Sequence, residues 1–411
     1  MKVLYKRNIR LYRNATFNVP ALRFPEFSGE WESIKLGDVL KLKGGYAFKS
    51  EKFQDSGVPV VRISNLPQNS YSVDLSDCVY YECGNYQNYT VKNGDLLIAM
   101  SGATTGKTAI YRYDYPAYLN QRVGLFAPKE LVHNQFLYPI VESKTFISQL
   151  GSKLVAGAQP NISSQDIETI AVGLPSKEEQ IKIAHLFELL NQKIETQSKI
   201  IEELTTLRSA LHHGIMCTGL EDGSWRMQTL AEVLSERAEL NNEGHAVHSV
   251  SVSKGIVNQI EYLGRSFAAK DTSRYHVAYP GDVVYTKSPT GEFPYGIVKQ
   301  SQISIKAALS PLYGVYVPIS PEIGYIIHNH FLSAKNALNY LHPLIQKGAK
   351  NTINITNQRF LQNSLPLPTN KNATLLYYNA IKTVSDKIIL EEMVMEKFQS
   401  HKSFLLKTMF I

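Results

Sequence analysis

The segment "SGATTGKT", Ser101 to Thr108, has the residue types of a phosphate-binding loop. A nucleotide-hydrolysing P-loop requires Gly, four further residues and Gly-Lys-Ser/Thr, followed by a helix. Here Ser101 stands where the first glycine belongs, and the continuation "AIYRYDYPAYLN" is strand-like and contains a proline. Backbone N–H groups with Thr104, Thr105 and Lys107 could instead contact DNA phosphates. An ordinary hairpin turn stays open as the alternative.

A second segment, "KLKGGYAFKSEKF" from Lys41 to Phe53, interleaves basic and aromatic residues, as nucleic-acid grooves do. A solvated loop with Tyr46 and Phe48 in the core is the alternative. In the major groove, Arg pairs with guanine, and Asn or Gln with adenine. The candidate DNA contacts predicted on this basis are Lys43, Tyr46, Lys49, Arg62, Asn65, Asn120, Gln121 and Arg122.

The second half of the chain offers fewer residues of these types. Contacts to phosphates outnumber contacts to bases in protein–DNA complexes, so most candidates are expected to position the DNA rather than to read it. The candidates in this half are Ser253, Lys254, Lys287, Ser288, Thr290, Lys350 and Asn354.

Catalytic signatures are missing from the sequence. We find no Ser–His–Asp set, no paired carboxylates and no metal-ligand spacing. His212 and His213 are adjacent on a predicted helix, so they point about 100° apart and cannot share a metal ion. The Asn-Pro-Pro-Tyr tetrapeptide and the glycine-rich cofactor loop of methyltransferases are absent as well. We therefore expect no catalytic residue, no metal and no cofactor in this chain.

The candidate residues lie in a chain that repeats itself. "AQPNISSQDIETIAVGLP" resembles "KNTINITNQRFLQNSLPLP", "WESIKLGDV" resembles "WRMQTLAEV", and "VKNGDLLIAMS" resembles "AYPGDVVYTKS". Two copies of one unit explain these matches better than chance. The apolar runs "DLLIAM" and "DVVYTK" predict strands. The stretches 31–40 and 225–234 are predicted to be short helices.

Each copy ends in a segment that predicts a long helix. Ser176 is a plausible N-cap, and Glu179 completes a capping box. Apolar residues then follow a heptad pattern, which favours a coiled coil between the two helices over packing of each helix on its own domain. The predicted seam consists of Phe187, Leu190, Ile194, Ile201, Leu204, Arg208 and Leu211 in the first helix, and of Ile381, Val384, Ile388, Glu391, Met395, Phe398, Lys402 and Leu405 in the second.

Four polar residues interrupt this seam. Antiparallel helices would satisfy all four if Arg208 met Glu391 and Gln197 met Lys402, because an unpaired charge in a seam is costly. The predicted fold class is therefore α+β, with two similar globular domains separated by two long antiparallel helices under a pseudo-twofold. The expected division is 1–175, 176–217, 218–368 and 369–411.

Composition agrees with a globular chain of several domains. At 411 residues, two to four domains are expected. A net charge of +7 and a pI of about 9.0 permit nucleic-acid binding. We predict no signal peptide and no membrane span. Three cysteines with irregular spacing indicate neither a disulfide framework nor a zinc site, so we expect a cytoplasmic protein.

Nearly the whole chain resembles the specificity subunits of type I restriction–modification systems. The resemblance lies in the duplicated opening at Trp31 and Trp225, in "NGDLLIAMSGATTGK", "GAQPNIS" and "LPSKEEQIKIA", and in the two long helices. It implies that each globular unit is a target-recognition domain for one half of a bipartite, gapped DNA site. It also implies that the helices space these domains.

The partners that the resemblance implies are double-stranded DNA, two modification (methyltransferase) subunits that dock on the helices, and restriction/translocase subunits. S-adenosylmethionine would belong to the methyltransferase, and ATP and Mg to the restriction subunit. This chain would be the non-catalytic specificity subunit of a DNA adenine methyltransferase/endonuclease complex. The alternatives are a nucleotide-binding enzyme built on "SGATTGKT" and a coiled-coil scaffold without DNA affinity.

Overall fold

The computed structural model describes residues 10–11, 18–67, 71–154, 161–265, 268–347 and 353–411. The chain divides into two compact units. Unit 1 comprises Met1–Ile200 and Glu391–Ile411, and unit 2 comprises Ile201–Leu390. Both long helices, α5 (Lys177–Glu221) and α11 (Lys371–Thr408), contribute to each unit. These two units have other boundaries than the predicted division into 1–175, 176–217, 218–368 and 369–411, which stays a prediction.

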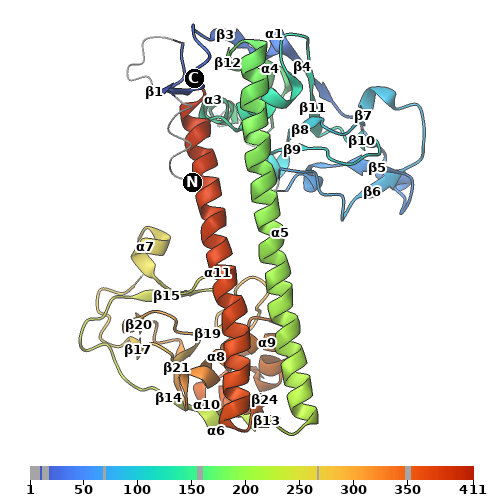
Figure 1. Ribbon diagram of the computed structural model, residues 1–411. Helices are drawn as coiled ribbons and strands as arrows, with labels where there is room; N and C mark the ends of the chain where they lie inside the picture. Colours follow the sequence, from blue (N-terminus) through green and yellow to red (C-terminus); the bar gives the residue numbers. More distant parts are fainter. Residues whose placement is uncertain (1–9, 12–17, 68–70, 155–160, 266–267, 348–352) are drawn as a thin grey trace. The chain divides into compact units, whose positions relative to one another are not determined.

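Unit 1 is built on two four-stranded sheets, in the orders β4-β11-β8-β9 and β6-β5-β10-β7 (Figure 1). A cluster that includes Val61, Leu97, Leu119 and Leu125 draws on strands of both sheets. The strands are β1 (Arg10–Leu11), β2 (Leu22–Arg23), β3 (Glu32–Lys35), β4 (Leu40–Gly44), β5 (Val58–Val61), β6 (Val79–Tyr81), β7 (Thr90–Val91), β8 (Leu96–Ala99), β9 (Thr108–Ile110), β10 (Ala117–Leu119), β11 (Val123–Pro128) and β12 (Ala171–Leu174).

Helices cover the second core of unit 1. Trp31, Phe136, Phe146 and Phe187 are buried in it together with Leu405 from α11. The short helices are α1 (Leu36–Val39), α2 (Leu137–Glu142), α3 (Lys144–Leu154) and α4 (Ser164–Glu168), with 3-10 turns η2 (Ser50–Lys52), η3 (Ile63–Asn65), η4 (Gln87–Tyr89), η5 (Gly102–Thr104) and η6 (Asn134–Phe136).

Unit 2 contains a four-stranded sheet in the order β14-β21-β18-β19. Its main core gathers Tyr285, Tyr316, Phe331 and Phe360 with Tyr377 from α11. The elements are β13 (Trp225–Thr229), α6 (Leu230–Val233), β14 (Leu234–Glu236), β15 (His248–Ser251), β16 (Gly255–Asn258), α7 (Gln259–Leu263), β17 (His276–Ala278), β18 (Val283–Tyr285), β19 (Val298–Gln300), β20 (Ala307–Leu309), β21 (Gly314–Pro318), α8 (Pro321–His330), α9 (Ala334–Leu341), η7 (His342–Leu344), β22 (Gln346–Lys347), β23 (Ile353–Asn354), α10 (Asn357–Phe360) and β24 (Ser364–Pro368).

The sheets β4-β11-β8-β9 and β14-β21-β18-β19 have corresponding registers. Leu40 pairs with Pro128 in unit 1, and Leu234 pairs with Pro318 in unit 2. The strands predicted from "DLLIAM" and "DVVYTK" are confirmed as β8 and β18. The two short helices predicted at the start of each copy are wrong in their first halves. There β3 and β13 pair antiparallel with β12 and β24, and only the last turn is helical.

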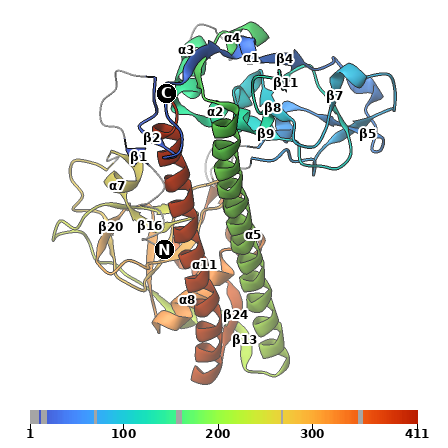
Figure 2. The same ribbon diagram turned by 45° about the horizontal axis from the view of Figure 1, so that its top comes forward.

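The two long helices are confirmed, and they pack together (Figures 1 and 2). In unit 1, Phe187, Leu190 and Ile194 are buried, and so is Leu405 of α11. In unit 2, Ile381 and Ile388 are buried. The remaining seam positions, Ile201, Leu204, Arg208, Leu211, Val384, Glu391, Met395 and Phe398, are half-buried.

The register predicted for the polar seam residues is wrong in its pairing of Gln197 with Lys402. The Gln197 amide donates to the backbone oxygen of Glu391, at 3.1 Å, and to its carboxylate. Lys402 instead forms an ion pair with Glu142, at 2.7 Å. The sequence pattern compared only the two helices with each other, whereas Lys402 is satisfied by a carboxylate from α2.

A buried ion pair fixes the start of α5. The Arg23 guanidinium donates to both carboxylate oxygens of Glu179, each at 2.7 Å, and to the carbonyl oxygens of Ser28 and Gly29. Both side chains are at most 5% exposed. The backbone N–H of Glu179 donates to the Ser176 hydroxyl at 3.4 Å, as the predicted N-cap requires. The Glu179 carboxylate, however, is held by Arg23. It therefore stabilises the segment that precedes β3 and does not complete the predicted capping box.

We expect Arg23→Met to lower the free energy of unfolding by about 3–5 kcal/mol, because it leaves the Glu179 carboxylate buried without its partner. Urea unfolding measures this change. The matched control is Glu26→Gln, which breaks the exposed Glu26–Lys182 pair and should cost less than about 1 kcal/mol. Equal costs for the two variants would contradict the role assigned to the buried pair.

Candidate nucleic-acid interface

Four loops of unit 1 that carry predicted DNA contacts are joined by backbone hydrogen bonds. The N–H of Tyr46 donates to Leu119 O at 2.8 Å, and the N–H of Gln121 donates to Tyr46 O at 2.9 Å. The N–H of Asn120 donates to Val61 O, which ties the turn at Arg62 to the same place. The N–H of Met100 donates to Arg122 O and so attaches the loop that begins at Ser101. Residues far apart in sequence therefore form one surface.

Gly45 permits this close approach. A Cβ atom at Gly45 would lie 2.2 Å from the carbonyl oxygens of Leu119 and Asn120, a distance that no side chain tolerates. The neighbouring Gly44 has open space at the same position. Gly45 thus decides where the backbone of Tyr46 lies against the 119–122 turn.

Tyr46 stands at the exposed edge of an aromatic cluster. Its ring centroid lies 5.0 Å from Phe48, 5.3 Å from Tyr86 and 5.2 Å from Tyr89. Phe48 is buried, whereas Tyr46 is 39% exposed, so the core alternative holds for Phe48 alone. An exposed aromatic ring beside Gln121 and Arg122 can pack against a sugar or a base. Sequence reasoning missed Tyr86 and Tyr89, although the tyrosine-rich run "YYECGNYQNY" was a signal.

The structure separates the remaining candidates of unit 1 by exposure. Lys43, Lys49, Gln121 and Arg122 are exposed, while Arg62, Thr104, Thr105, Lys107 and Asn120 are half-buried. Asn65 is corrected: it is 3% exposed, its amide donates to Asp74 O at 2.9 Å, and its oxygen accepts from the N–H of Arg62. Its side chain stabilises the turn that carries Arg62 and does not reach the surface.

The loop at Gly102–Thr104 is not a P-loop. After Lys107 the chain enters strand β9, where a P-loop would begin a helix. The Thr105 hydroxyl donates to Gly102 O at 2.6 Å, which closes the turn locally. The geometry therefore argues against nucleotide hydrolysis at this loop.

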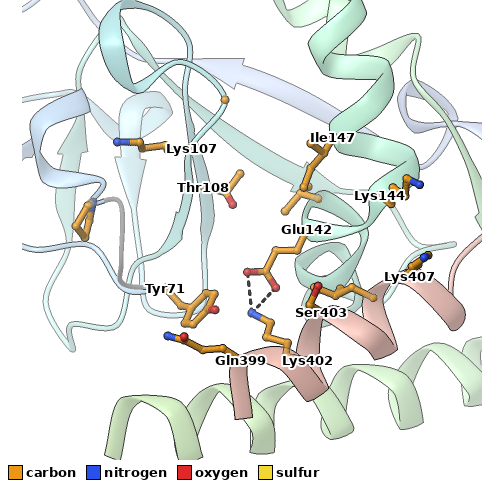
Figure 3. Close-up of a pocket in the computed structure, with 14 residues that line it drawn as sticks. Tyr71, Lys107, Thr108, Glu142, Lys144, Ile147, Gln399, Lys402, Ser403 and Lys407 are labelled. Carbon is orange, nitrogen blue, oxygen red and sulfur yellow. Dashed lines mark hydrogen bonds and ion pairs between the residues drawn. The ribbon is translucent and has the colours of Figure 1, made fainter. Parts of the chain in front are cut away.

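A cavity of about 530 Å³ borders Lys107 and is lined by residues of the loop, of α2, of α3 and of α11 (Figure 3). At its centre, Glu142 and Lys402 form their ion pair, and the Lys402 ammonium lies 3.5 Å from the centroid of the Tyr71 ring. Burial raises the pKa of Glu142 and lowers the pKa of Lys402, and each charge opposes the shift of the other. Lys107, Lys144 and Lys407 point away from this pair, which leaves them available to phosphate groups outside it.

In unit 2 the candidates lie on two separate loops. Ser253 and Lys254 are exposed in the turn between β15 and β16. Ser288 and Thr290 are exposed after β18. Lys287 has a positive φ of 61°, a backbone conformation that costs energy for a side-chain-bearing residue. Its ammonium is half-buried, and burial lowers its pKa.

Gly296 makes room for Lys287, since a Cβ there would lie 2.7 Å from its backbone nitrogen. Asn354 belongs to β23, where it pairs with Gln346. Lys350 lies outside the described residues.

The described residues contain no group of three or more His, Cys, Asp or Glu side chains placed to hold a metal ion. In the same residues, no helix is long and apolar enough to cross a membrane. The chemical groups that these loops present are therefore hydrogen-bond donors, ammonium and guanidinium groups, and aromatic rings.

Residues 28–206 match the family model of the type I restriction modification DNA specificity domain. The chain is 28% identical over 200 residues to the type I restriction enzyme MjaVIII specificity subunit of Methanocaldococcus jannaschii, which covers 47% of each chain. It is 23% identical over 255 residues to the type I restriction enzyme EcoBI specificity subunit of Escherichia coli, covering 61% of this chain and 50% of that one. The chain thus spans about half the length of these relatives.

The fold is similar to that of a type I restriction–modification system S subunit from M. genitalium. The TM-score is 0.61 at 12% sequence identity, over 98% of this chain and 99% of the other. At this identity the likeness concerns the fold alone.

Gly45→Ala is expected to lower the free energy of unfolding by about 2 kcal/mol or more, because the added methyl group must push the 45–46 backbone away from Leu119 and Asn120. Gly44→Ala, with open space around it, is the matched control and should change stability by less than about 0.5 kcal/mol. Urea unfolding of both variants measures the difference. Indistinguishable midpoints would show that the close approach at Gly45 is unimportant.

Proposed function

We propose that this chain is the specificity subunit of a type I restriction–modification complex, because residues 28–206 match the family model of the type I restriction modification DNA specificity domain. Each unit would read one half of a bipartite, gapped site in double-stranded DNA. The helix pair α5 and α11 would space the two reading units. One observation carries the proposal: within the matched region, Tyr46, Gln121 and Arg122 are brought to one exposed surface by backbone hydrogen bonds.

Two features support a second reading unit. The sheets β4-β11-β8-β9 and β14-β21-β18-β19 have the same order of corresponding strands, which are antiparallel in both. The chain also repeats its sequence around these strands, as in "NGDLLIAMS" and "PGDVVYTKS". Two copies of one fold can read two half-sites independently, because each presents its own loops. The equivalent surface of unit 2 would be formed by the loops at Lys254 and at Lys287.

Catalysis would belong to partner subunits. We propose that two modification (methyltransferase) subunits bind S-adenosylmethionine and methylate adenine in the half-sites. Restriction/translocase subunits would use ATP and Mg. None of these three cofactors is assigned to this chain.

The exposed apolar side chains of the long helices support docking of the modification subunits. Where exposed apolar side chains gather on one surface, they mark protein–protein contacts. In unit 1 they are Ile181, Leu189, Met393 and Phe404, and in unit 2 they are Leu207, Leu220, Leu376, Ile389 and Leu390. Each unit therefore offers apolar side chains of both helices to a partner.

The two-module proposal predicts the result of a domain exchange. Replacement of residues 221–368 by the corresponding domain of another specificity subunit should change one half-site and leave the other unchanged. Mapping of methylated adenines in cells that carry the chimera and the modification subunit gives the answer. The chain purified alone should transfer no methyl group, which serves as the control. A change in both half-sites would refute the independence of the units.

The docking proposal predicts a stoichiometry. Phe404→Glu or Leu376→Glu should each remove one of two modification subunits from the purified complex, since a charge replaces an apolar contact in one unit only. Native mass spectrometry counts the subunits. The control is Lys397→Glu, an exposed position on α11 that lies outside the apolar set. Retention of two modification subunits in both variants would rule out these contacts.

A further inference from the structure

Lys287 has a strained backbone conformation shortly after β18. Its φ of 61° makes it the one non-glycine residue with positive φ in the described part of the chain. Such a conformation persists only where the surroundings hold it, and it occurs mostly at functional sites. Here the N–H of Thr286 donates to Ile297 O, and the N–H of Ile297 donates to the Thr286 hydroxyl, each at 3.1 Å. Gly296 lies against the Lys287 backbone itself, so the strain is imposed from both sides of the loop.

The sequence repeat places Met100 of unit 1 at the position of Lys287. The Met100 side chain packs on the core of unit 1, and its sulfur would be 3.0 Å from a Cβ added at Gly124. In unit 2 the glycine with the matching strand register, Gly314, is covered by the Tyr316 ring. The space that methionine occupies in unit 1 is therefore taken in unit 2, and the Lys287 side chain has to lie elsewhere.

The Lys287 side chain ends in an ammonium group without a partner. Among the residues that the structure describes, none forms a hydrogen bond or an ion pair with this group. Glu236 acts on it only at a distance, and the Glu236 carboxylate accepts a hydrogen bond from the Asn357 amide. The side chain is half-buried, yet its Nζ is not one of the wholly enclosed polar atoms that lack a partner, so solvent reaches it. A packed stem thus presents an unpaired donor group at the surface.

We propose that Lys287 reads a guanine in the DNA half-site of unit 2, its ammonium donating to O6 and N7 in the major groove. Lysine and arginine are the side chains suited to this contact, because guanine presents two acceptors at that edge. The inference rests on the proposed function and deepens it, since it assigns one base to one residue. Ser288 and Thr290, exposed on the same loop, offer hydroxyl groups that suit the adjacent phosphates.

A base contact suits Lys287 better than a phosphate contact. Phosphates recur along each strand and carry no sequence information, whereas a base edge has to be met at one fixed place. The held backbone and the packed stem fix where the Lys287 ammonium lies before DNA arrives. A side chain ordered in advance loses less conformational entropy on binding, which favours a contact of defined geometry.

The test compares the wild type with Lys287→Met in the complete complex with the modification subunits. Methionine keeps the packed stem and is the residue that unit 1 has, so thermal unfolding should show a variant folded like the wild type. Mapping of methylated adenines in cells should find that one guanine of the unit 2 half-site is no longer required, while the unit 1 half-site is unchanged. Lys287→Gly, which adopts this φ without strain, should lose the same guanine. Lys335→Met, exposed on α9, is the matched control and should keep both half-sites.

Binding of the complexes to synthetic DNA identifies the atoms that are read. Replacement of the guanine by 7-deazaguanine removes the N7 acceptor and keeps the base pair, so it should weaken wild-type binding several-fold. Exchange of the G·C pair for an A·T pair should weaken it about 10-fold or more. The Lys287→Met complex should bind all three DNAs with nearly equal affinity.

Three results would overturn the inference. The first is a Lys287→Met complex that still requires the same guanine. The second is an equal loss of affinity for every DNA sequence, which would assign Lys287 to a phosphate. The third is a unit 2 half-site without any G·C pair. In these cases a wild-type complex that methylates a gapped site leaves the proposed function intact, whereas a wild-type complex that methylates none refutes the proposed function and this inference with it.

Discussion

A helix of 45 residues with an apolar stripe along one side is stable in water only if that stripe is buried, and much of this chain is arranged around that requirement. In unit 1, Phe187 of α5 and Leu405 of α11 enter the same core as Trp31. In unit 2, Tyr377 and Ile381 of α11 enter the core that contains Trp225. Each unit thus closes its core with segments that lie far apart in the sequence.

Packing of the two cores also buries charges, and the structure compensates several of them locally. Arg23 is held by Glu179, Lys402 by Glu142, and Arg237 of unit 2 by Asp282 at 2.7 Å. Desolvation of an ion costs several kcal/mol, so each pair is needed once one of its members is enclosed.

The candidate DNA surface of unit 1 depends on backbone geometry more than on the polar side chains themselves. The 119–122 turn accepts the N–H of Tyr46 at Leu119 O and donates the N–H of Gln121 to Tyr46 O, and this close approach is possible because Gly45 has no side chain. Tyr46 then stands exposed above Phe48 and beside Tyr86. A polar residue of suitable type, such as Asn65, is turned inward where a tight turn needs its amide.

The sequence by itself determined the features that depend on local pattern. The heptad spacing identified α5 and α11, and the apolar runs after Gly-Asp identified β8 and β18, because periodicity and turn residues act within one segment. Only the tertiary structure decided the partners of those segments. Glu142 reaches Lys402 from α2, and Glu179 turns from its own N-cap to Arg23. Such pairings depend on which surfaces meet after folding, and a linear pattern holds no information about the distance between segments that are not neighbours in the chain.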